Sequence, residues 1–193
     1  MLLAFDPDGG CGALDDAAER ARVHRPSLHV PYAPHVVTIA RVSPSDAVAG
    51  RIVRAYLTDV ASRWHGRTAS EDEVDRALAD EPFDDLVEPT GVLLVASDGG
   101  QAVGCAGARF LGNVAELTKV FVSPTRRGTG LGAALLRAVE AACREQGVAV
   151  LRLDTRAALA EACALYERSG FERVAPFNAD PYADRWYRKV LEP

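Results

Sequence analysis

The sequence predicts an α/β (α+β) domain built on a mixed, mostly antiparallel seven-stranded sheet flanked by about four helices. From about residue 35 to the end, strand and helix patterns follow in the order β-α-α-β-β-β-α-β-α-β-β. Three consecutive strands between residues 91 and 122 are joined by short turns, which is typical of an antiparallel meander. The next strand, over residues 148–154, follows a helix and is therefore expected to pair in parallel.

Length and composition limit the function classes. The 193 residues, 48% of them hydrophobic, suffice for one domain with a substantial core. No apolar run approaches the roughly 20 residues of a membrane span, and no signal-peptide core is recognisable. We therefore expect a cytoplasmic protein without a membrane partner. The formal net charge of −5 gives no basic footprint for nucleic acid and is compatible with a cationic acceptor as well as with ordinary solubility.

The four cysteines show neither a CxxC pair nor metal-ligand spacing, so we expect no metal site. Three of them, Cys105, Cys143 and Cys163, stand within apolar patterns and are expected to be small core residues.

The first 34 residues differ from the rest. Loop-forming residues are followed by one short helical pattern, and Pro26, Pro31 and Pro34 forbid a continuing regular element. We predict an N-terminal extension over residues 1–34 and a single domain over residues 35–193. A role for the extension in oligomer formation, including a homodimer, is left open.

The first half of the domain contains a strand, two helices and the meander. A strand is expected over 35–42 and a helix from the Ser43–Asp46 turn to about residue 63. Ser70 and Glu73 have capping-box spacing, which predicts a second helix through about residue 79. The meander strands are expected over residues 91–96, 101–110 and 115–122.

A glycine-rich turn joins the last meander strand to a helix. The turn consists of Arg126, Arg127, Gly128, Thr129, Gly130, Leu131 and Gly132. Closely spaced glycines leave backbone amides uncovered and allow positive φ. Apolar residues recur at helical spacing from Leu131 onward, so the helix begins inside the glycine run, where its free N–H groups favour a bound phosphate. The two arginines beside this opening could add positive charge.

This arrangement resembles the acetyl-CoA loop of the GNAT superfamily, the acetyl-CoA-dependent N-acetyltransferases, and specifically small bacterial members. The family's Arg/Gln-x-x-Gly-x-Gly/Ala pattern is filled here by residues 127–132. A second resemblance is Leu165-Tyr166 followed by Gly170-Phe171 at the end of a later helix. The family branch often has an asparagine where this chain has Arg156. The predicted order of elements is that of the GNAT fold.

The resemblance implies acetyl transfer from acetyl-CoA to a primary amine. It implies contacts to acetyl-CoA from Val120, Phe121 and Val122, from the loop over residues 126–132, and from Tyr166. Tyr166 matches the family's general acid, which protonates the leaving thiolate; a half-buried tyrosine bonded to backbone is the alternative. A backbone N–H near Phe121 or Val122 would hold the oxyanion.

Candidates for the base and the acceptor pocket are less specific. Glu116 opens the strand where many family members place a glutamate that acts through water, although an exposed strand glutamate is equally compatible. Asp154 could bind the acceptor ammonium or cap the next helix. His35 and His65 are further candidate bases. The remaining substrate-binding candidates are Trp64, Asn178 and Tyr182.

Several functions remain open at this point. A small-molecule amine is the expected acceptor, and a protein N-terminus or lysine is the alternative. A module that binds acetyl-CoA without transferring its acetyl group is a third possibility, against which the presence of Tyr166 and Glu116 argues mildly. A dinucleotide-binding domain fits poorly, because the glycine spacing is G-x-G-x-G and the loop follows an antiparallel meander.

Overall fold

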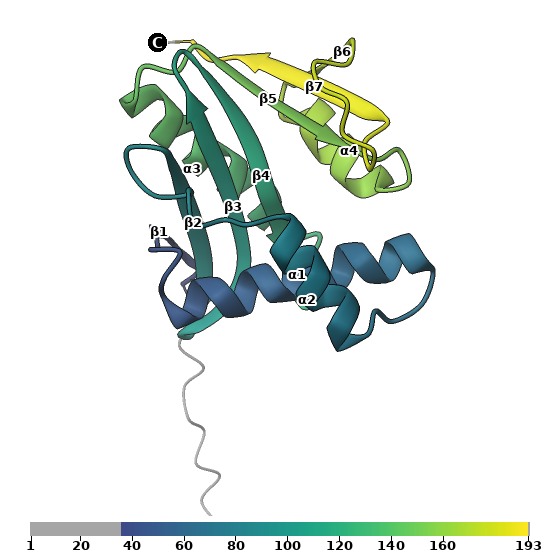
Figure 1. Ribbon diagram of the computed structural model, residues 1–193. Helices are drawn as coiled ribbons and strands as arrows, with labels where there is room; N and C mark the ends of the chain where they lie inside the picture. Colours follow the sequence, from purple (N-terminus) through teal and green to yellow (C-terminus); the bar gives the residue numbers. More distant parts are fainter. Residues whose placement is uncertain (1–35, 193) are drawn as a thin grey trace, which may run out of the picture. The chain divides into compact units, whose positions relative to one another are not determined.

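The computed structural model describes residues 36–192. The extension predicted over residues 1–34, which includes Cys11, lies outside the described residues, as does His35. Seven strands form one sheet in the order β1-β2-β3-β4-β5-β7-β6, and four α-helices flank it (Figure 1). The predicted fold class and order of elements are confirmed.

The element boundaries agree with the prediction to within a few residues. The strands are β1 Thr38–Arg41, β2 Gly91–Asp98, β3 Gln101–Leu111, β4 Val114–Val122, β5 Val150–Thr155, β6 Glu172–Val174 and β7 Arg185–Val190. The helices are α1 Ala47–His65, α2 Glu71–Asp80, α3 Leu131–Glu145 and α4 Ala160–Arg168, with a 3-10 turn η1 over Pro124–Arg126. The strand predicted over 91–96 continues to Asp98 because its pairing with β3 extends to the Gly99-Gly100 turn. Among residues 36–192, no helix combines the length and apolar character needed to cross a bilayer.

The parallel pairing of β4 with β5 is confirmed, but it is short. Only Val114, Ala115 and Glu116 have partners on β5, at Val150, Leu151 and Arg152. Beyond Glu116 the two strands part, and Figure 1 shows them diverging from the upper end of the sheet. The sheet therefore consists of a β1–β4 part and a β5–β7–β6 part that share one short seam.

A bulge in β4 accompanies this divergence. Cys105 pairs with Phe121 and Gly107 with Thr118, so two β4 residues stand opposite one residue of β3. Lys119, in the bulge, is the one non-glycine residue with positive φ (53°) within the described part of the chain. An extra residue in one strand bends that strand and increases its twist, which here turns β4 away from β5.

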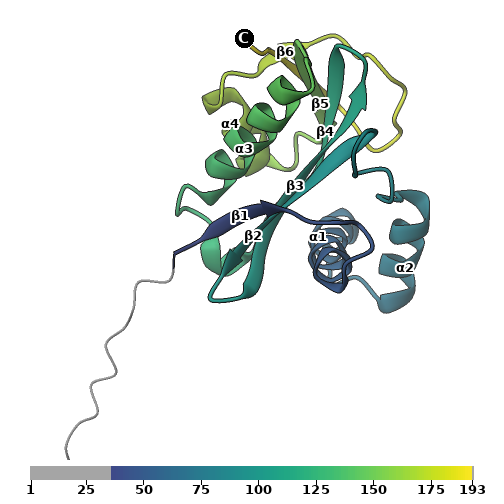
Figure 2. The same ribbon diagram turned by 90° about the vertical axis from the view of Figure 1, so that its left-hand side faces the viewer.

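Helices cover both faces of the sheet (Figure 2). Successive strand residues point to opposite faces, and β2 is buried on both. Its Leu94 belongs to a core shared with α3, whereas Leu93 and Val95 belong to a second core under α1 and α2. The two cores fix α1 and α2 on one side of the strands that diverge, and α3 on the other.

Gly91 tests how closely the backbone of β2 packs against β3 and against the loop that precedes β2. A Cβ at this position would lie 2.6 Å from the carbonyl oxygen of Ala108 and 2.8 Å from that of Asp85. Because both atoms are backbone, we expect Gly91→Ala to lower the free energy of unfolding by about 3 kcal/mol, the upper range for overpacking. The matched control is Gly50→Ala on α1, where a Cβ meets nothing within 4 Å and a gain of about 1 kcal/mol is expected. Urea denaturation measures the free energy of unfolding of both variants. Equal values for Gly91→Ala and Gly50→Ala would contradict the close backbone contacts at Gly91.

Candidate functional site

A cavity of about 870 Å³ opens where β4 and β5 separate. Its walls come from the second half of β4, the glycine loop, the end of β5, α4 and one face of α1. Of the residues singled out in the sequence, those that line it are Glu116, Val120, Phe121, Val122, Arg126, Arg127, Gly128, Gly130, Leu131, Gly132, Asp154, Tyr166, Asn178 and Tyr182. The topology thus brings together most of the candidates from separate parts of the chain.

The glycine loop has the geometry of an anion site. Gly128 and Gly130 have φ values of +76° and +84°, a region that residues with a Cβ rarely adopt. Gly130 is the N-cap of α3, and no side chain caps this helix end. The amides of the first turn, with the helix dipole behind them, are therefore available to a phosphate group.

The two loop arginines are less available than the sequence indicated. The Arg127 guanidinium donates to Asp59 of α1 at 3.0 Å and to the carbonyl oxygen of Val122 at 3.1 Å. Arg126 forms an ion pair with Asp98 at the end of β2. Both positive charges already have carboxylate partners, so the α3 amides are the main groups that this loop leaves free for an anion.

Tyr166 lies in the wall of the cavity and is 6% exposed. Its ring packs edge-on against Phe171 at a centroid distance of 5.8 Å, and Tyr187 lies at 6.0 Å. Burial raises the pKa of the Tyr166 hydroxyl, so the group stays protonated at neutral pH. A protonated hydroxyl in a cavity wall is suited to donating a proton to a leaving group.

Asp154 is half-buried at the end of β5, and its hydrogen-bond partner is neutral. Its Oδ2 accepts a hydrogen bond of 2.6 Å from Asn178, whose own Oδ1 accepts one of 2.8 Å from the Trp186 indole. Burial raises the pKa of Asp154, and the nearby carboxylates of Asp180, Glu116 and Glu81 add to that effect against the Asn178 hydrogen bond. A carboxylate of this kind can bind an ammonium group and can take up a proton.

Glu116 is held differently. Its Oε1 accepts from both Nε and Nη2 of Arg152, at 3.1 and 2.6 Å, and Phe177 stacks on the same guanidinium at 4.4 Å. The Glu116 carboxylate lines the cavity but already has a cation, so it is a weaker candidate for binding an acceptor ammonium than Asp154.

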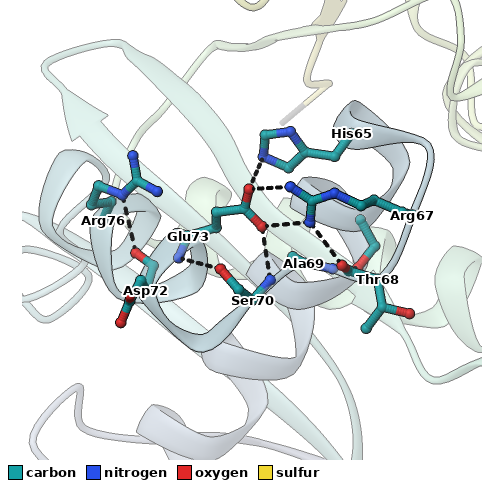
Figure 3. Close-up of polar contacts among 9 residues, drawn as sticks. His65, Arg67, Thr68, Ala69, Ser70, Asp72, Glu73 and Arg76 are labelled. Atoms are coloured by element: carbon teal, nitrogen blue, oxygen red, sulfur yellow. Dashed lines mark hydrogen bonds and ion pairs between the residues drawn. The ribbon is translucent and has the colours of Figure 1, made fainter.

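Three candidates from the sequence do not line the cavity. Thr129 points its hydroxyl back to the carbonyl oxygen of Arg126. His65 faces Glu73 of α2 at 3.4 Å (Figure 3). Trp64, 47% exposed, packs edge-on against Tyr182, which does line the cavity.

Other cavity residues were not singled out in the sequence as site residues. Tyr56, Asp59 and Arg63 come from α1, where Asp59 and Arg63 form an i,i+4 ion pair. Lys119 is 1% exposed and pairs with Glu81 at 2.6 Å, also in the cavity wall. Nothing in the local sequence distinguishes Lys119 from a solvated lysine, because its burial depends on the bulge.

The comparison with known proteins identifies the family. Residues 56–171 match the model of the acetyltransferase (GNAT) family. The chain belongs to this family. The resemblance inferred from the loop and from the Tyr166 segment is confirmed, and family membership makes this chain an N-acetyltransferase.

Relatives of this GNAT chain act on different acceptors. It is 34% identical over 149 residues to an IAA acetyltransferase of Azospirillum brasilense, covering 76% of this chain and 90% of that protein. It is 30% identical over 146 residues to the aminoglycoside N(6')-acetyltransferase type 1 of Stenotrophomonas maltophilia, covering 71% and 87%.

A solved structure of the same fold contains coenzyme A. The PaiA N-acetyltransferase of Thermoplasma acidophilum, crystallised with coenzyme A, superposes with a TM-score of 0.64. The alignment covers 80% of this GNAT chain and 99% of that one at 18% identity, a level that establishes the shared fold.

Proposed function

We propose that this GNAT chain transfers the acetyl group of acetyl-CoA to a primary amine of a small molecule. The observation that carries the proposal is one continuous cavity between β4 and β5 with an uncapped helix N-terminus at the glycine loop and Asp154 on β5. The first suits an anionic donor, and the second suits a cationic acceptor.

The length of β4 sets the distance between the glycine loop and the point where β4 and β5 stop pairing. Glu116, where β4 and β5 still pair, is six residues before Val122, where the strand gives way to the loop. At about 3.3 Å per residue the two positions lie roughly 20 Å apart. A donor whose phosphates are bound at the loop can therefore lie along β4 with its thioester toward the point where β4 and β5 separate.

The acceptor ammonium must first release one proton to solvent, because only the neutral amine has a lone pair. The neutral amine nitrogen then forms a bond to the acetyl carbon while the thioester carbon–sulfur bond breaks, so nitrogen loses a second proton and sulfur gains one. We assign the proton uptake to Asp154, whose hydrogen-bond partner Asn178 is neutral, and the proton donation to Tyr166. Glu116, predicted as the base acting through water, is retained as a second proton acceptor, and a β4 amide near Phe121 as the oxyanion donor.

The proposal is tested by amine-dependent release of coenzyme A from acetyl-CoA with the purified protein. A thiol reagent follows the release over a panel of small amines, with a lysine peptide and a peptide with a free N-terminus beside them. Turnover with a small amine supports the proposal. Turnover confined to the peptides would transfer the assignment to a protein acetyltransferase. Acetyl-CoA binding without turnover on any acceptor would favour a non-catalytic binding module.

Substituting the two carboxylates separates their roles. We expect Asp154→Asn to lower kcat/KM for the amine roughly 30-fold, the value of one charge-assisted hydrogen bond, and Glu116→Gln to lower it less than tenfold. The wild-type enzyme needs ionised Asp154, so its activity should fall as the pH falls through the raised Asp154 pKa. This acidic limb should be missing from the residual activity of Asp154→Asn. An equal loss in both variants, with the limb retained, would contradict the assignment.

A further inference from the structure

The last turn of α1 reaches across the opening between the two parts of the sheet. Arg63 forms an ion pair with Glu161 in the first turn of α4. The Trp64 ring lies 4.1 Å from the guanidinium carbon of Arg156, in the segment between β5 and α4, and 5.3 Å from the Tyr182 ring. We call these five residues, Arg63, Trp64, Arg156, Glu161 and Tyr182, the α1 clasp.

On the β1–β4 side of the cavity, ion pairs connect the clasp to the end of β4. Asp59, one turn before Arg63, forms ion pairs with Arg63 and with Arg127, each at 3.0 Å. Arg127 in turn donates to the carbonyl oxygen of Val122. A chain of ion pairs therefore runs from the glycine loop through α1 to α4, and its four charged residues all line the cavity.

The end of α1 is also braced against α2 (Figure 3). The Glu73 carboxylate accepts from the Ser70 amide at 2.8 Å and from both terminal nitrogens of Arg67, at 2.9 and 2.6 Å. The Arg67 guanidinium is the main cause that lowers the pKa of Glu73 to about 2. The Ala69 amide donates to Ser62 on α1 at 2.9 Å. These bonds hold the turn between α1 and α2 in place, and with it the last turn of α1, which carries Arg63 and Trp64.

The seam on the other side of the cavity is short. β4 and β5 pair at only three register positions, and β4 bends away after Glu116. The separation of the two walls therefore depends on contacts made beyond the seam. The clasp supplies such contacts, joining α1 on the β1–β4 wall to residues 156–161 and Tyr182 on the β5–β7–β6 wall.

We infer that the α1 clasp sets the width of the cavity and makes Arg63 and Trp64 positioning residues for the transfer reaction, an inference that rests on the proposed function. They act through the β5–α4 segment, which carries Asp154 at one end and Tyr166 at the other. Rates of transfer between two bound reactants depend steeply on geometry, and a displacement of about 1 Å can cost on the order of 100-fold. The same contacts are partly exposed and contribute little to global stability.

The test compares Arg63→Met and Trp64→Ala with Arg54→Met. Arg54 is a matched control, because it is also on α1 and pairs with two carboxylates, Glu71 and Asp75, but does not line the cavity. We expect kcat to fall at least tenfold in both clasp variants, with the acetyl-CoA Kd changed less than threefold and thermal unfolding close to that of Arg54→Met. Trp64→Phe should keep most of the activity. A kcat within twofold of the Arg54→Met value in both clasp variants would overturn the inference.

A second readout does not need activity. Amide hydrogen exchange of the free protein should become faster over residues 156–163 in Arg63→Met and Trp64→Ala, and remain unchanged there in Arg54→Met. Unchanged exchange in the clasp variants would mean that these contacts do not hold the two walls together, and the inference would fail. If the wild-type protein releases no coenzyme A with any amine, the proposed function and the positioning role fail together, whereas faster exchange would still identify the clasp as the link between the walls.

Discussion

Replacing Tyr166 by phenylalanine is expected to lower kcat on the order of 1,000-fold while leaving the affinity for acetyl-CoA nearly unchanged. The substitution removes the hydroxyl assigned as the proton donor and keeps the ring that packs against Phe171 and Tyr187. Turnover at saturating amine, together with calorimetric titration with acetyl-CoA, measures the two quantities separately.

The neighbouring Tyr187 supplies a matched control. It is 1% exposed and donates its hydroxyl to Glu167 at 2.9 Å, but it does not line the cavity. Tyr187→Phe should therefore cost about 1 kcal/mol of unfolding free energy, as for one hydrogen bond, with kcat within about twofold of wild type. A Tyr166→Phe enzyme with wild-type turnover would remove Tyr166 from the role of general acid.

Replacing Gly130 by glutamate is expected to weaken acetyl-CoA binding at least ~100-fold, because a carboxylate would compete with the phosphates for the α3 amides. The position also has φ +84°, so that any side chain introduces backbone strain. Calorimetric titration of the variant beside the wild-type protein measures the loss.

The strain is controlled by Gly100→Glu. Gly100 has φ +82° in the β2–β3 turn, and a Cβ there, as at Gly130, meets nothing within 4 Å. Both variants should lose a similar unfolding free energy, about 1–2 kcal/mol, but Gly100→Glu should bind acetyl-CoA like the wild type. Equal binding by all three proteins would place the donor somewhere other than the glycine loop.

The part of the site that is local in sequence could be predicted from the sequence alone. The strand before the loop, the alternating glycines and the helix that begins among them are set by backbone preferences and hydrophobic periodicity over fewer than thirty residues. The structure has β4, the positive-φ glycines and α3 at these positions. The capping box of Ser70 and Glu73 was predictable for the same reason, since both partners lie within one turn. The meander and the parallel β4–β5 pair followed from connection lengths.

The pairing of charges could not be predicted in this way. Arg127 is 68 residues from Asp59, and Arg63 is 98 residues from Glu161, so that no local pattern associates them. The sequence indicated that Arg126 and Arg127 could add positive charge beside the loop, and only the folded chain brings carboxylates to both. The strength of an ionic contact depends on which surfaces the fold brings together.

The sequence by itself determined the family, the fold, the position of the glycine loop and the tyrosine at the end of a later helix, because each is encoded in short, contiguous patterns. Only the tertiary structure decided that β4 leaves β5 after Glu116 and that Lys119 is buried. It also decided that Asp154 has a neutral partner whereas Glu116 has a cation, and that Trp64 bridges two walls instead of lining the cavity. Each of these depends on a bulge, on burial or on a contact between residues distant in sequence, and such features arise only when the whole chain has packed.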